Sequence, residues 1–339
     1  MRTVLYLNDD DVRPLVKMSD ILAYCEEAYR LYGRHQAGKL YAHFAPISSY
    51  PTKVPHTDVD YRSGVMEGIP AICSTLGWGF WDNPAKYGLP SVSVVTALND
   101  VKTGLLLSLI SGYYLGAART GAAGGVASKY LARAASSSLG IVGTGNVGHY
   151  MLWSHLELFK GIDVVKAWSR DGAKARKFAM TYGKQFGVKI EAVGSLREAV
   201  EGMDIVCAAV PTREPLIKGE WVGRGTHINA FGADSKGKQE LDPGILQRAD
   251  KIVVDSMEQC RVAGEINVPL SQGLISEGKV YGQIGELVNG WKKGREGADE
   301  LTVMDSTGVS ALDIVTYYRA YEKSLRAKVG TKLALSGVK

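Results

Sequence analysis

The run Leu139-Gly-Ile-Val142 followed by Gly143-Thr-Gly-Asn-Val-Gly148 sets our interpretation of the fold. The first four residues are an apolar run typical of a short buried strand, and a helix is predicted to continue to about Phe159. A Gly-x-Gly-x-x-Gly motif is a weak signal alone, but a strand before it and a helix after it are the context in which it binds phosphates. We therefore predict a strand–turn–helix unit that binds a dinucleotide. The alternative is a glycine-rich turn without a ligand.

Each glycine of the motif has its own physical purpose. Gly143 permits the tight turn, Gly145 lets the backbone approach a pyrophosphate, and Gly148 allows close packing of the helix on the strand. The N-terminus of the helix then presents unpaired N–H groups and the positive end of its dipole to the phosphates. The predicted phosphate-binding residues are Gly143, Thr144, Gly145, Asn146, Val147 and Gly148.

Strands and helices continue to alternate beyond the motif. Residues 163–168 predict a second strand and residues 172–183 a second helix. Further segments of this alternation follow at residues 189–193, 195–200, 203–210, 226–230 and 251–254. The pattern predicts an α/β fold with a Rossmann-type, doubly wound parallel sheet.

The N-terminal part has a different pattern. Residues 3–7 predict a strand, and residues 19–32 predict a helix with Ser19 and Asp20 as candidate N-caps. Short β-rich runs then predict an antiparallel sheet. These runs are residues 41–47, 64–66, 71–76 and 91–98, followed by a hairpin turn at 99–104 and a strand at 105–110.

Two further helices are expected outside these sheets. Residues 117–134 are rich in Ala and Gly, which predicts a helix in close contact with its surroundings. Residues 313–328 form an amphipathic pattern typical of a helix, and the last residues of the chain are expected to fray.

The composition excludes several classes of protein. The 339 residues are 45% hydrophobic and carry a net charge of +5, so the chain has material for a large core and no concentrated basic stripe for nucleic acid. No apolar run approaches the ~20 residues of a membrane span, and the N-terminus does not resemble a signal peptide. Four widely spaced cysteines argue against a zinc site or disulfide framework. We expect a cytoplasmic protein without metal, membrane or nucleic-acid partners.

The tip of the second predicted strand indicates which dinucleotide is bound. An NAD site usually places Asp or Glu there to hold the ribose 2′-hydroxyl. This chain has Ser169 and Arg170 instead, and a hydroxyl with a guanidinium suits a 2′-phosphate. Asp171 comes late for the ribose and is alternatively an N-cap of the next helix. We therefore predict a preference for NADP(H), with NAD(H) possible.

Five stretches together resemble the ornithine cyclodeaminase/mu-crystallin family. They are Leu98-Asn-Asp100 with Thr103-Gly104, Arg119-Thr-Gly-Ala122, the glycine motif, the segment from Gly232 to Leu241, and Asp305-Ser-Thr-Gly308 with Asp313. The segment Gly232-Ala-Asp-Ser-Lys-Gly-Lys-Gln-Glu-Leu241 is similar to the family's Gly-x-Asp-x-x-Gly-Lys-x-Glu-Leu pattern. The stretches follow the family's order over residues 98–313.

The resemblance implies a discontinuous layout and a homodimer. Residues 1–119 with 308–339 would form an α+β substrate-binding and dimerisation domain, and residues 120–307 would form the Rossmann domain. The site would lie in the cleft between them. Beyond the glycine motif and the strand tip, the cofactor-binding residues are then predicted to include Thr120, Val210, Pro211, Phe231, Gly232 and Ser306.

Asp234 and Arg119 are the predicted catalytic residues. Asp234 follows a predicted strand, at the edge of the sheet where ligands of open α/β folds bind, and a carboxylate there could exchange a proton with an amine. The alternative for Asp234 is a turn-forming residue. Arg119 could bind a substrate carboxylate bidentately, and its alternative is a salt bridge across the domain junction. The resemblance favours the functional role for both.

The substrate region departs from the family pattern. Members that act on α-amino acids typically have Pro-Arg and a following Lys, whereas this chain has Pro55-His56 and no Lys in residues 73–81. Lys53, Arg62 or Lys86 could supply the missing charge. Trp78, Phe80 and Trp81 suggest a larger or less polar substrate, or alternatively core packing. The predicted substrate-binding residues are His56, Arg62, Thr75, Trp78 and Arg119.

These observations predict an NADP(H)-dependent oxidoreductase that acts on a C–N bond, as an imine reductase or an amino-acid dehydrogenase does. One alternative is an ammonia lyase of the ornithine cyclodeaminase type that uses bound NAD. Another is a non-catalytic protein that binds NADP(H) and a small molecule. Asp234 argues against the last, because a binding protein does not need a proton donor there.

Overall fold

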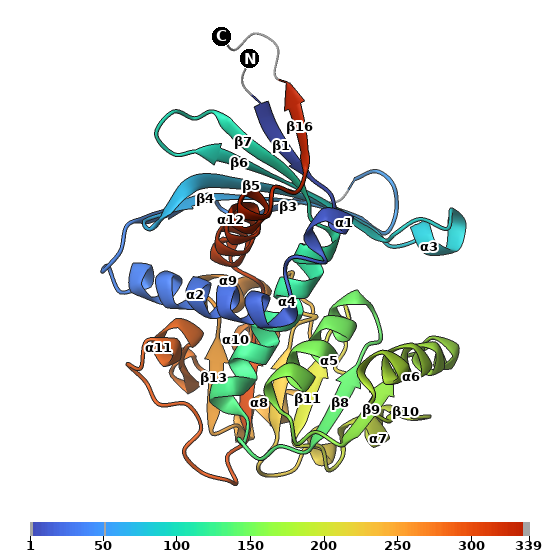
Figure 1. The fold of residues 1–339 in the computed structure, drawn as a ribbon. Coiled ribbons are helices and arrows are strands. Elements are labelled where there is room, and N and C mark those ends of the chain that lie inside the picture. The colour runs from blue at the N-terminus through green and yellow to red at the C-terminus, as the bar shows by residue number, and fades with distance from the viewer. Residues whose placement is uncertain (1–2, 51, 335–339) are drawn as a thin grey trace. The chain divides into compact units, whose positions relative to one another are not determined.

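The computed structural model describes residues 3–50 and 52–334, without the side chains of residues 48–50. The chain forms two compact units, Met1–Arg119 with Ser310–Lys339 and Thr120–Val309. Helix α4 (Tyr113–Leu131) begins in the first unit and ends in the second (Figure 1).

The second unit is built on an eight-stranded sheet in which every neighbouring pair of strands is parallel. The strand order is β10-β9-β8-β11-β12-β15-β13-β14. The strands are β8 (Ser138–Val142), β9 (Val164–Trp168), β10 (Ile190–Ala192), β11 (Ile205–Ala208), β12 (His227–Ala230), β13 (Lys251–Val254), β14 (Val280–Gln283) and β15 (Thr302–Asp305). The predicted α/β fold with a doubly wound parallel sheet is confirmed.

Helices connect these strands, as parallel pairing requires. They are α5 (Asn146–Leu158), α6 (Gly172–Phe186), α7 (Leu196–Val200), α8 (Pro243–Arg248), α9 (Met257–Ala263), α10 (Asn267–Ser271) and α11 (Ile284–Val288), with single 3₁₀ turns at Gly219–Trp221 and Glu277–Lys279. Strands β8, β11, β12, β13 and β15 are buried along their whole length. Their apolar runs without alternation reflect this burial on both faces.

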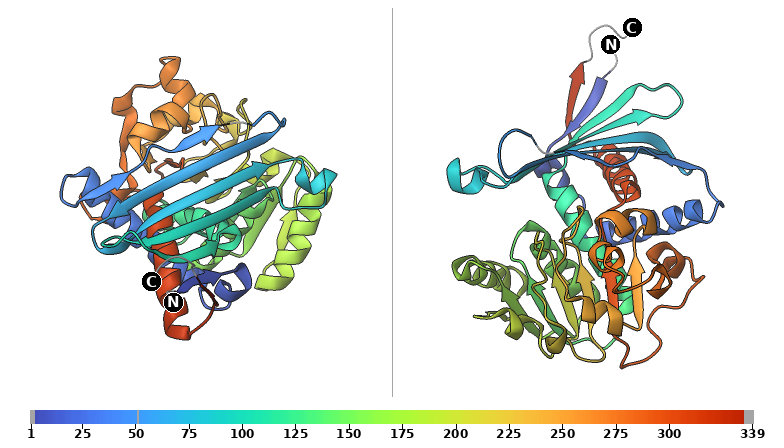
Figure 2. Two further views of the ribbon diagram at one scale, coloured as in Figure 1. Left: turned by 90° about the horizontal axis from the view of Figure 1, so that it is seen from above. Right: turned by 180° about the vertical axis from the view of Figure 1, so that it is seen from behind.

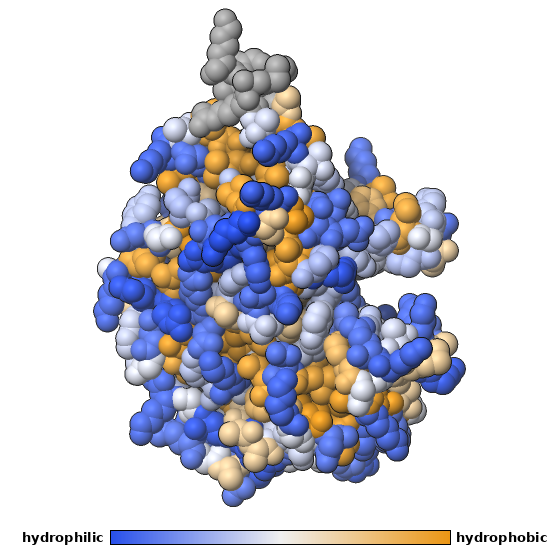
Figure 3. All heavy atoms as spheres, in the orientation of Figure 1, coloured by the Kyte–Doolittle hydropathy of each residue, from blue (hydrophilic) through white to orange (hydrophobic). Residues whose placement is uncertain are grey.

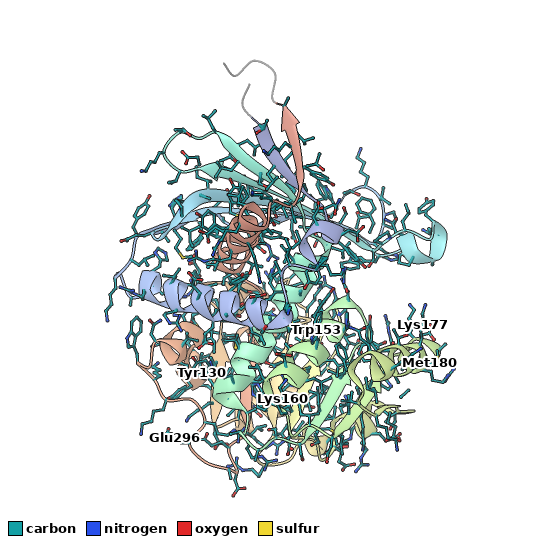
Figure 4. The ribbon with its side chains drawn as sticks, viewed as in Figure 1. Tyr130, Trp153, Lys160, Lys177, Met180 and Glu296 are labelled. Atoms are coloured by element: carbon teal, nitrogen blue, oxygen red, sulfur yellow. The ribbon has the colours of Figure 1, made fainter. Side chains whose placement is uncertain are left out.

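Helices α5 and α6 contact each other through aromatic rings. His149 of α5 stacks on Tyr182 of α6 with ring centroids 3.9 Å apart, and Trp153 lies 5.8 Å from Phe186. Figure 4 labels Trp153 on α5 with Lys177 and Met180 on α6. Met180 is exposed, so the aromatic contact lies on the opposite side of α6 from that residue.

A buried polar network joins α4, α5 and the sheet. The His155 ring bonds the Met151 carbonyl through Nδ1 at 2.7 Å and the Ser128 hydroxyl through Nε2 at 2.7 Å. The Asn229 amide of β12 also donates to Ser128, at 2.8 Å. Burial lowers the pKa of His155 to about 4, because no water solvates the imidazolium there. Asn229 is therefore part of the core packing of this unit.

The first unit is built on a second eight-stranded sheet, in the order β16-β1-β7-β6-β5-β4-β2 with β3 also paired to β4. All pairs are antiparallel except β1 with β7. The strands are β1 (Thr3–Leu7), β2 (Ala42–Phe44), β3 (Ser48–Tyr50), β4 (Thr57–Met66), β5 (Ile69–Phe80), β6 (Val92–Asp100), β7 (Leu106–Ser111) and β16 (Thr331–Ala334). The predicted hairpin at residues 99–104 joins β6 to β7.

Helix α12 (Ser310–Ala327) packs on one face of this sheet, against β4 and β5, and α2 (Met18–Gln36) packs on α12. Ion pairs connect the two helices: Arg319 bonds Glu27 at 2.5 Å and Lys323 bonds Asp20 at 2.6 Å. Two single-turn helices, α1 (Asp9–Val12) and α3 (Asn83–Lys86), lie in connections. The left view of Figure 2 shows the opposite face of the sheet, over which no described helix lies.

Three local expectations for this unit change. Helix α2 begins after Lys17, and Asp20 accepts a hydrogen bond from the Lys17 N–H, so Ser19 is not the N-cap. Strand β4 begins at Thr57, well before the predicted residues 64–66. Residues 331–334, expected to fray, form β16 and pair with β1; residues 335–339 lie outside the described residues. The start of β4 was missed because its helix-covered face carries the polar residues Asp58, Asp60 and Arg62, so the strand lacks the alternation of apolar and polar residues that predicts one.

Among the described helices, none combines the length and apolar character needed to cross a membrane.

The buried His155 predicts a specific pH dependence of stability. In the unfolded chain this imidazole has its ordinary pKa near 6.5, whereas in the fold its pKa is about 4. The stabilisation by the neutral ring is therefore complete above pH 6.5 and declines as the pH falls toward 4, by about 3 kcal/mol in total. We expect the difference in unfolding free energy between the wild type and His155→Asn to shrink by that amount over this range, measured by urea denaturation. Parallel pH profiles for the two proteins would contradict it.

Candidate cofactor and substrate sites

The glycine turn between β8 and α5 has the geometry that the sequence predicts. Gly143 has φ +102, a conformation that L side chains rarely adopt. A Cβ on Gly148 would lie 2.0 Å from the Gly143 carbonyl oxygen, so this helix position tolerates no side chain. A Cβ on Gly145 would meet no atom within 4 Å. The protein itself therefore requires Gly143 and Gly148, whereas the space beside Gly145 is open to a ligand.

The N-terminus of α5 fits a phosphate. Gly145 is the N-cap and supplies no side-chain hydrogen bond to the first turn of this 13-residue helix. Gly145 and Asn146 are exposed, and Thr144 and Val147 are partly exposed. The first N–H groups of a helix lack acceptors within it, and together with the helix dipole they favour an anion. The residues of this turn thus match the pyrophosphate of a dinucleotide.

The tip of β9 presents a hydroxyl and a free cation beside this turn. Ser169 is partly exposed and Arg170 is exposed, and within residues 3–50 and 52–334 Arg170 makes no ion pair. The Asp171 carboxylate accepts a hydrogen bond from the Ala173 N–H at 2.9 Å and is the N-cap of α6. Asp171 therefore caps α6, as the alternative interpretation of this residue predicted, and its carboxylate is bound to that helix rather than left free for a ribose.

The loops after β11 and β12 are joined by one side chain. The Glu240 carboxylate accepts hydrogen bonds from the Val210 N–H at 2.7 Å and from the Gly232 N–H at 2.6 Å. Pro211 is exposed, and Phe231 is partly buried against the core of this unit. The two loops that carry four of the predicted cofactor-binding residues are thus held against each other.

Asp234 lies on the loop that follows β12. Its carboxylate is 57% exposed and pairs with the Lys238 ammonium group. Asn267 holds this loop, because its side chain accepts from the Gly237 N–H at 3.0 Å and donates to the Lys238 carbonyl at 3.0 Å. Asp234 is therefore an accessible carboxylate on a fixed loop, with a cation beside it.

The remaining predicted cofactor residues of this unit are less exposed. The Ser306 hydroxyl donates to the Asp255 carboxylate at 2.7 Å, and the Gly308 N–H donates to the same oxygen at 2.7 Å. Ser306 thus helps to fix the segment after β15. Thr120 is partly exposed on α4. Their contact with a cofactor stays a prediction.

In the first unit, Arg119 and Arg62 share one carboxylate. Arg119 Nε donates to Asp313 Oδ1 at 2.9 Å, and Arg62 Nη1 lies 3.9 Å from Asp313 Oδ2. All three side chains are largely buried, with exposed fractions of 11%, 16% and 3%. Asp60 Oδ2 lies 3.8 Å from Arg62 Nη2, so two carboxylates accompany the two guanidinium groups. Arg62 Nη1 is buried and has no hydrogen-bond partner among the described residues. The salt bridge of Arg119 thus lies within its own unit.

Thr75 belongs to the same face of the sheet as Arg62. The two residues are directly opposite each other in the pairing of β4 with β5. Thr75 Oγ1 lies 2.9 Å from Thr96 Oγ1 of β6, so its hydroxyl already has a partner. Trp78 is three residues further along β5 and therefore points to the opposite face. The structure brings Arg62, Thr75 and Arg119 to one side of the sheet and places Trp78 on the other.

His56 lies apart from this cluster. It is on the exposed connection before β4, with φ +56, and its Nδ1 lies 3.2 Å from Asp82 Oδ1. Lys86 bonds the other oxygen of Asp82 at 2.8 Å. Both partners belong to the segment around α3, so the imidazole helps to fix that segment to β4.

Several residues that organise these sites were not singled out from the sequence. Glu240, Glu265, Asp255 and Asn267 hold loop N–H groups, and Asp313 pairs with two arginines. Glu240 and Asp313 stood within the quoted family stretches, which was the available signal. In the described ranges, no group of three or more His, Cys, Asp or Glu side chains is placed to hold a metal ion.

The sequence of this chain matches a known protein family over nearly its whole length. The family model described as the ornithine cyclodeaminase/mu-crystallin family matches residues 5–328. The chain belongs to this family. The resemblance inferred from the sequence is thereby confirmed.

Among its relatives is the alanine dehydrogenase of Archaeoglobus fulgidus, 38% identical over 97% of this chain and 98% of the relative. An archaeal alanine dehydrogenase dimer with bound NAD has 37% identity and a TM-score of 0.89, covering 98% of this chain and all of that one. The Δ1-pyrroline-2-carboxylate reductase of Thermococcus litoralis, solved with NADH and L-proline, has 35% identity and a TM-score of 0.90 over 97% of this chain and all of that one.

The different environments of Gly145 and Gly148 predict different effects of the same substitution. Gly148→Ala should destabilise the protein by more than about 3 kcal/mol, because the new methyl group meets a backbone carbonyl. Gly145→Ala should leave the unfolding free energy within about 0.5 kcal/mol, since φ is −81 and the space is open, yet weaken NADPH binding about tenfold or more. Chemical denaturation and NADPH fluorescence titration measure both. Unchanged NADPH affinity in Gly145→Ala would contradict the phosphate assignment.

Proposed function

We propose that this chain is an NADP(H)-dependent oxidoreductase that reduces an imine, or oxidises an amine, at a carbon that also bears a carboxylate. The observation that carries the proposal is the β8–α5 turn, where the space beside Gly145 is open while Gly143 and Gly148 are fixed by the fold. The named activities of the relatives then supply the reaction class.

The predicted enzyme class is confirmed by these relatives: an oxidoreductase that uses a nicotinamide cofactor and acts on CH–NH or CH–NH₂ groups. The relatives are named as an alanine dehydrogenase and a pyrroline-2-carboxylate reductase, both of which act at a carbon–nitrogen bond. The two solved structures contain NAD or NADH. A nicotinamide cofactor supplies hydride transfer when it is bound.

Arg119 and Arg62 support a carboxylate-bearing substrate. Their guanidinium groups flank Asp313 in a largely buried setting, and Arg62 Nη1 has no hydrogen-bond partner among the described residues. A substrate carboxylate would supply that acceptor. The Lys and Arg that family members typically use for this purpose are absent, and Arg62 supplies one of the missing cations from β4. We infer that the substrate carboxylate binds these two arginines.

Asp234 supports proton exchange with the substrate nitrogen. Its carboxylate is accessible and pairs with the Lys238 ammonium group. In the reducing direction an acid must deliver a proton to the nitrogen, and in the oxidising direction a base must remove one. Asp234 serves both directions in this proposal.

The preference for NADP(H) is proposed from the strand tip. Ser169 offers a hydroxyl, and Arg170 offers an exposed guanidinium with no ion partner among the described residues. No carboxylate occupies the tip, because Asp171 caps α6. A 2′-phosphate satisfies this arrangement better than a ribose hydroxyl does.

A homodimer is proposed from the uncovered face of the first unit's sheet. Tyr61 and Leu76 are exposed partners in the β4–β5 pairing. The next pair on that face is Trp78, which is partly exposed, and Val59, which is buried. Figure 3 shows orange, apolar side chains near β1 and β16 of this unit, whereas the uncovered face itself is the one presented in the left view of Figure 2. A second copy would remove these side chains from water. The cytoplasmic location expected from the cysteines stays a prediction; all four are free and buried.

The activity is tested by NADPH consumption with 2-oxo acids in the presence and absence of ammonia or methylamine, and with cyclic imines that carry a carboxylate. We expect consumption that requires the amine or occurs with the cyclic imines. Asp234→Ala should abolish turnover while NADPH binding is retained. Release of ammonia from ornithine or lysine without net NADPH consumption would instead establish the lyase.

The strand tip gives a second test. Ser169→Asp combined with Arg170→Ala should change the preference from NADPH toward NADH, because a carboxylate repels the 2′-phosphate and accepts from the 2′-hydroxyl. The ratio of kcat/KM for the two cofactors is the measurement, and Lys184→Ala, an exposed change in the last turn of α6, is the control. An unchanged ratio would remove Ser169 and Arg170 from cofactor selection.

A further inference from the structure

Glu240 is a buried carboxylate that joins the ends of two neighbouring strands. It is 1% exposed, and it follows β12 by ten residues along the loop that carries Asp234. Its Oε1 accepts from the Val210 N–H and its Oε2 from the Gly232 N–H, at 2.7 and 2.6 Å. Val210 follows β11 and Gly232 follows β12, and these strands are paired in the sheet. Each carboxylate oxygen thus holds one strand end.

The two strand ends lie too close for any side chain between them. A Cβ on Gly232 would be 2.4 Å from the Val210 carbonyl oxygen and 2.6 Å from the Glu240 carboxyl carbon. Glycine is therefore required at residue 232, and Glu240 occupies the remaining space. The separation of the two loops is set by this side chain.

Further carboxylates hold Glu240 in its place. The Glu240 and Leu241 N–H groups donate to Glu265 at distances between 2.6 and 3.0 Å. The Glu265 and Ile266 N–H groups in turn donate to Asp305, at 2.8 and 3.1 Å. Glu265 thus holds the backbone segment that carries Glu240, and Asp305 holds the segment that carries Glu265. Glu240 is thus the last member of a series that begins at the end of β15.

We propose that Glu240 is a positioning residue that fixes the loops after β11 and β12 in the geometry that receives the nicotinamide end of the cofactor. This inference rests on the proposed function. Val210, Pro211, Phe231 and Gly232 of these loops are predicted cofactor-binding residues, and Glu240 reaches them only through the backbone. Strands β9 and β11 lie on opposite sides of β8. With the adenosine ribose at the β9 tip and the pyrophosphate at the β8–α5 turn, the nicotinamide end extends over β11 and β12. A carboxylate suits the position because it accepts twice and donates nowhere, as two facing N–H groups require.

Glu240→Gln tests the proposal with almost no change in size. The amide group has one accepting oxygen and a donating NH₂, so either Val210 or Gly232 loses its acceptor. In the cofactor-free protein we expect one of these two amides to exchange hydrogen at least tenfold faster than in the wild type. Glu191→Gln, an exposed change on β10, is the matched control and should leave both amides protected. Full protection of both amides in Glu240→Gln would overturn the proposal.

A cofactor fragment separates positioning from a general loss of structure. NADPH should bind Glu240→Gln at least tenfold more weakly than it binds the wild type. The 2′-phosphorylated ADP-ribose fragment, which lacks nicotinamide, should bind both proteins alike because the β8–α5 turn is intact. If Glu240→Gln binds NADPH and the fragment more weakly by the same factor, the substitution does not act specifically on the nicotinamide end, and the proposal is contradicted. If the wild type binds neither ligand, the proposed function fails, while the exchange measurement still tests the link between the loops.

The wild type provides a second test in case Glu240→Gln does not fold. Burial raises the pKa of Glu240 to about 7, with the Asp234 carboxylate adding to the effect, and a protonated Glu240 has one accepting oxygen fewer. Glu265, between α9 and α10, faces Glu240, and Asp305 of β15 faces Glu265 in turn; burial raises the pKa of both. We expect the ratio of NADPH affinity to fragment affinity to fall severalfold between pH 8.5 and pH 6. The ratio cancels titration of the 2′-phosphate, and a constant ratio would overturn the proposal.

Discussion

Backbone N–H groups beyond the ends of a buried parallel sheet need acceptors, and in the second unit carboxylates supply them. Glu240 serves the ends of β11 and β12, Glu265 serves the segment that carries Glu240, and Asp305 serves the segment that carries Glu265. Asp255, which follows β13, accepts from the Gly308 N–H and also from the Ser306 hydroxyl. The loops that carry the predicted cofactor-binding residues take their conformation from these bonds, since an unpaired buried N–H costs on the order of 1–3 kcal/mol.

In the first unit, the alternation of side chains along each strand determines which residues lie on each face of the sheet. The face of its sheet that α12 covers holds Arg62, Thr75 and Thr96, and Asp313 of α12 joins Arg62 to Arg119. The opposite face holds Tyr61, Leu76 and Trp78. One sheet thus separates a charged, buried surface from an apolar, exposed one. The charged side suits a small anionic substrate, and the apolar side suits a second copy of the chain.

The sequence was most informative where a feature is local. The glycine turn, the parallel strands β8 to β13 and the hairpin after β6 each depend on residues a few positions apart, and they occur where predicted. Strands β14 and β15 were not predicted. Strand β4 was only partly predicted, because Asp58, Asp60 and Arg62 put polar side chains on its covered face. The Arg62–Asp313–Arg119 cluster joins positions far apart in the chain, so it could not be predicted from residue spacing. Glu240 was visible within a family segment, but its two bonds depend on how β11 and β12 pair.

The buried carboxylates also make folding of the chain a proton-uptake reaction near neutral pH. Burial raises the pKa of Glu240 to about 7, of Asp305 to about 8, and of Glu265 well above its ordinary value. In the unfolded chain these groups are ionised above about pH 4.5, so the native state holds protons that unfolding releases to the buffer. The protonated groups contribute fully to stability below about pH 4.5, and this contribution is lost as the pH rises through their pKa values in the folded protein. The heat of unfolding will therefore depend on the ionisation enthalpy of the buffer chosen.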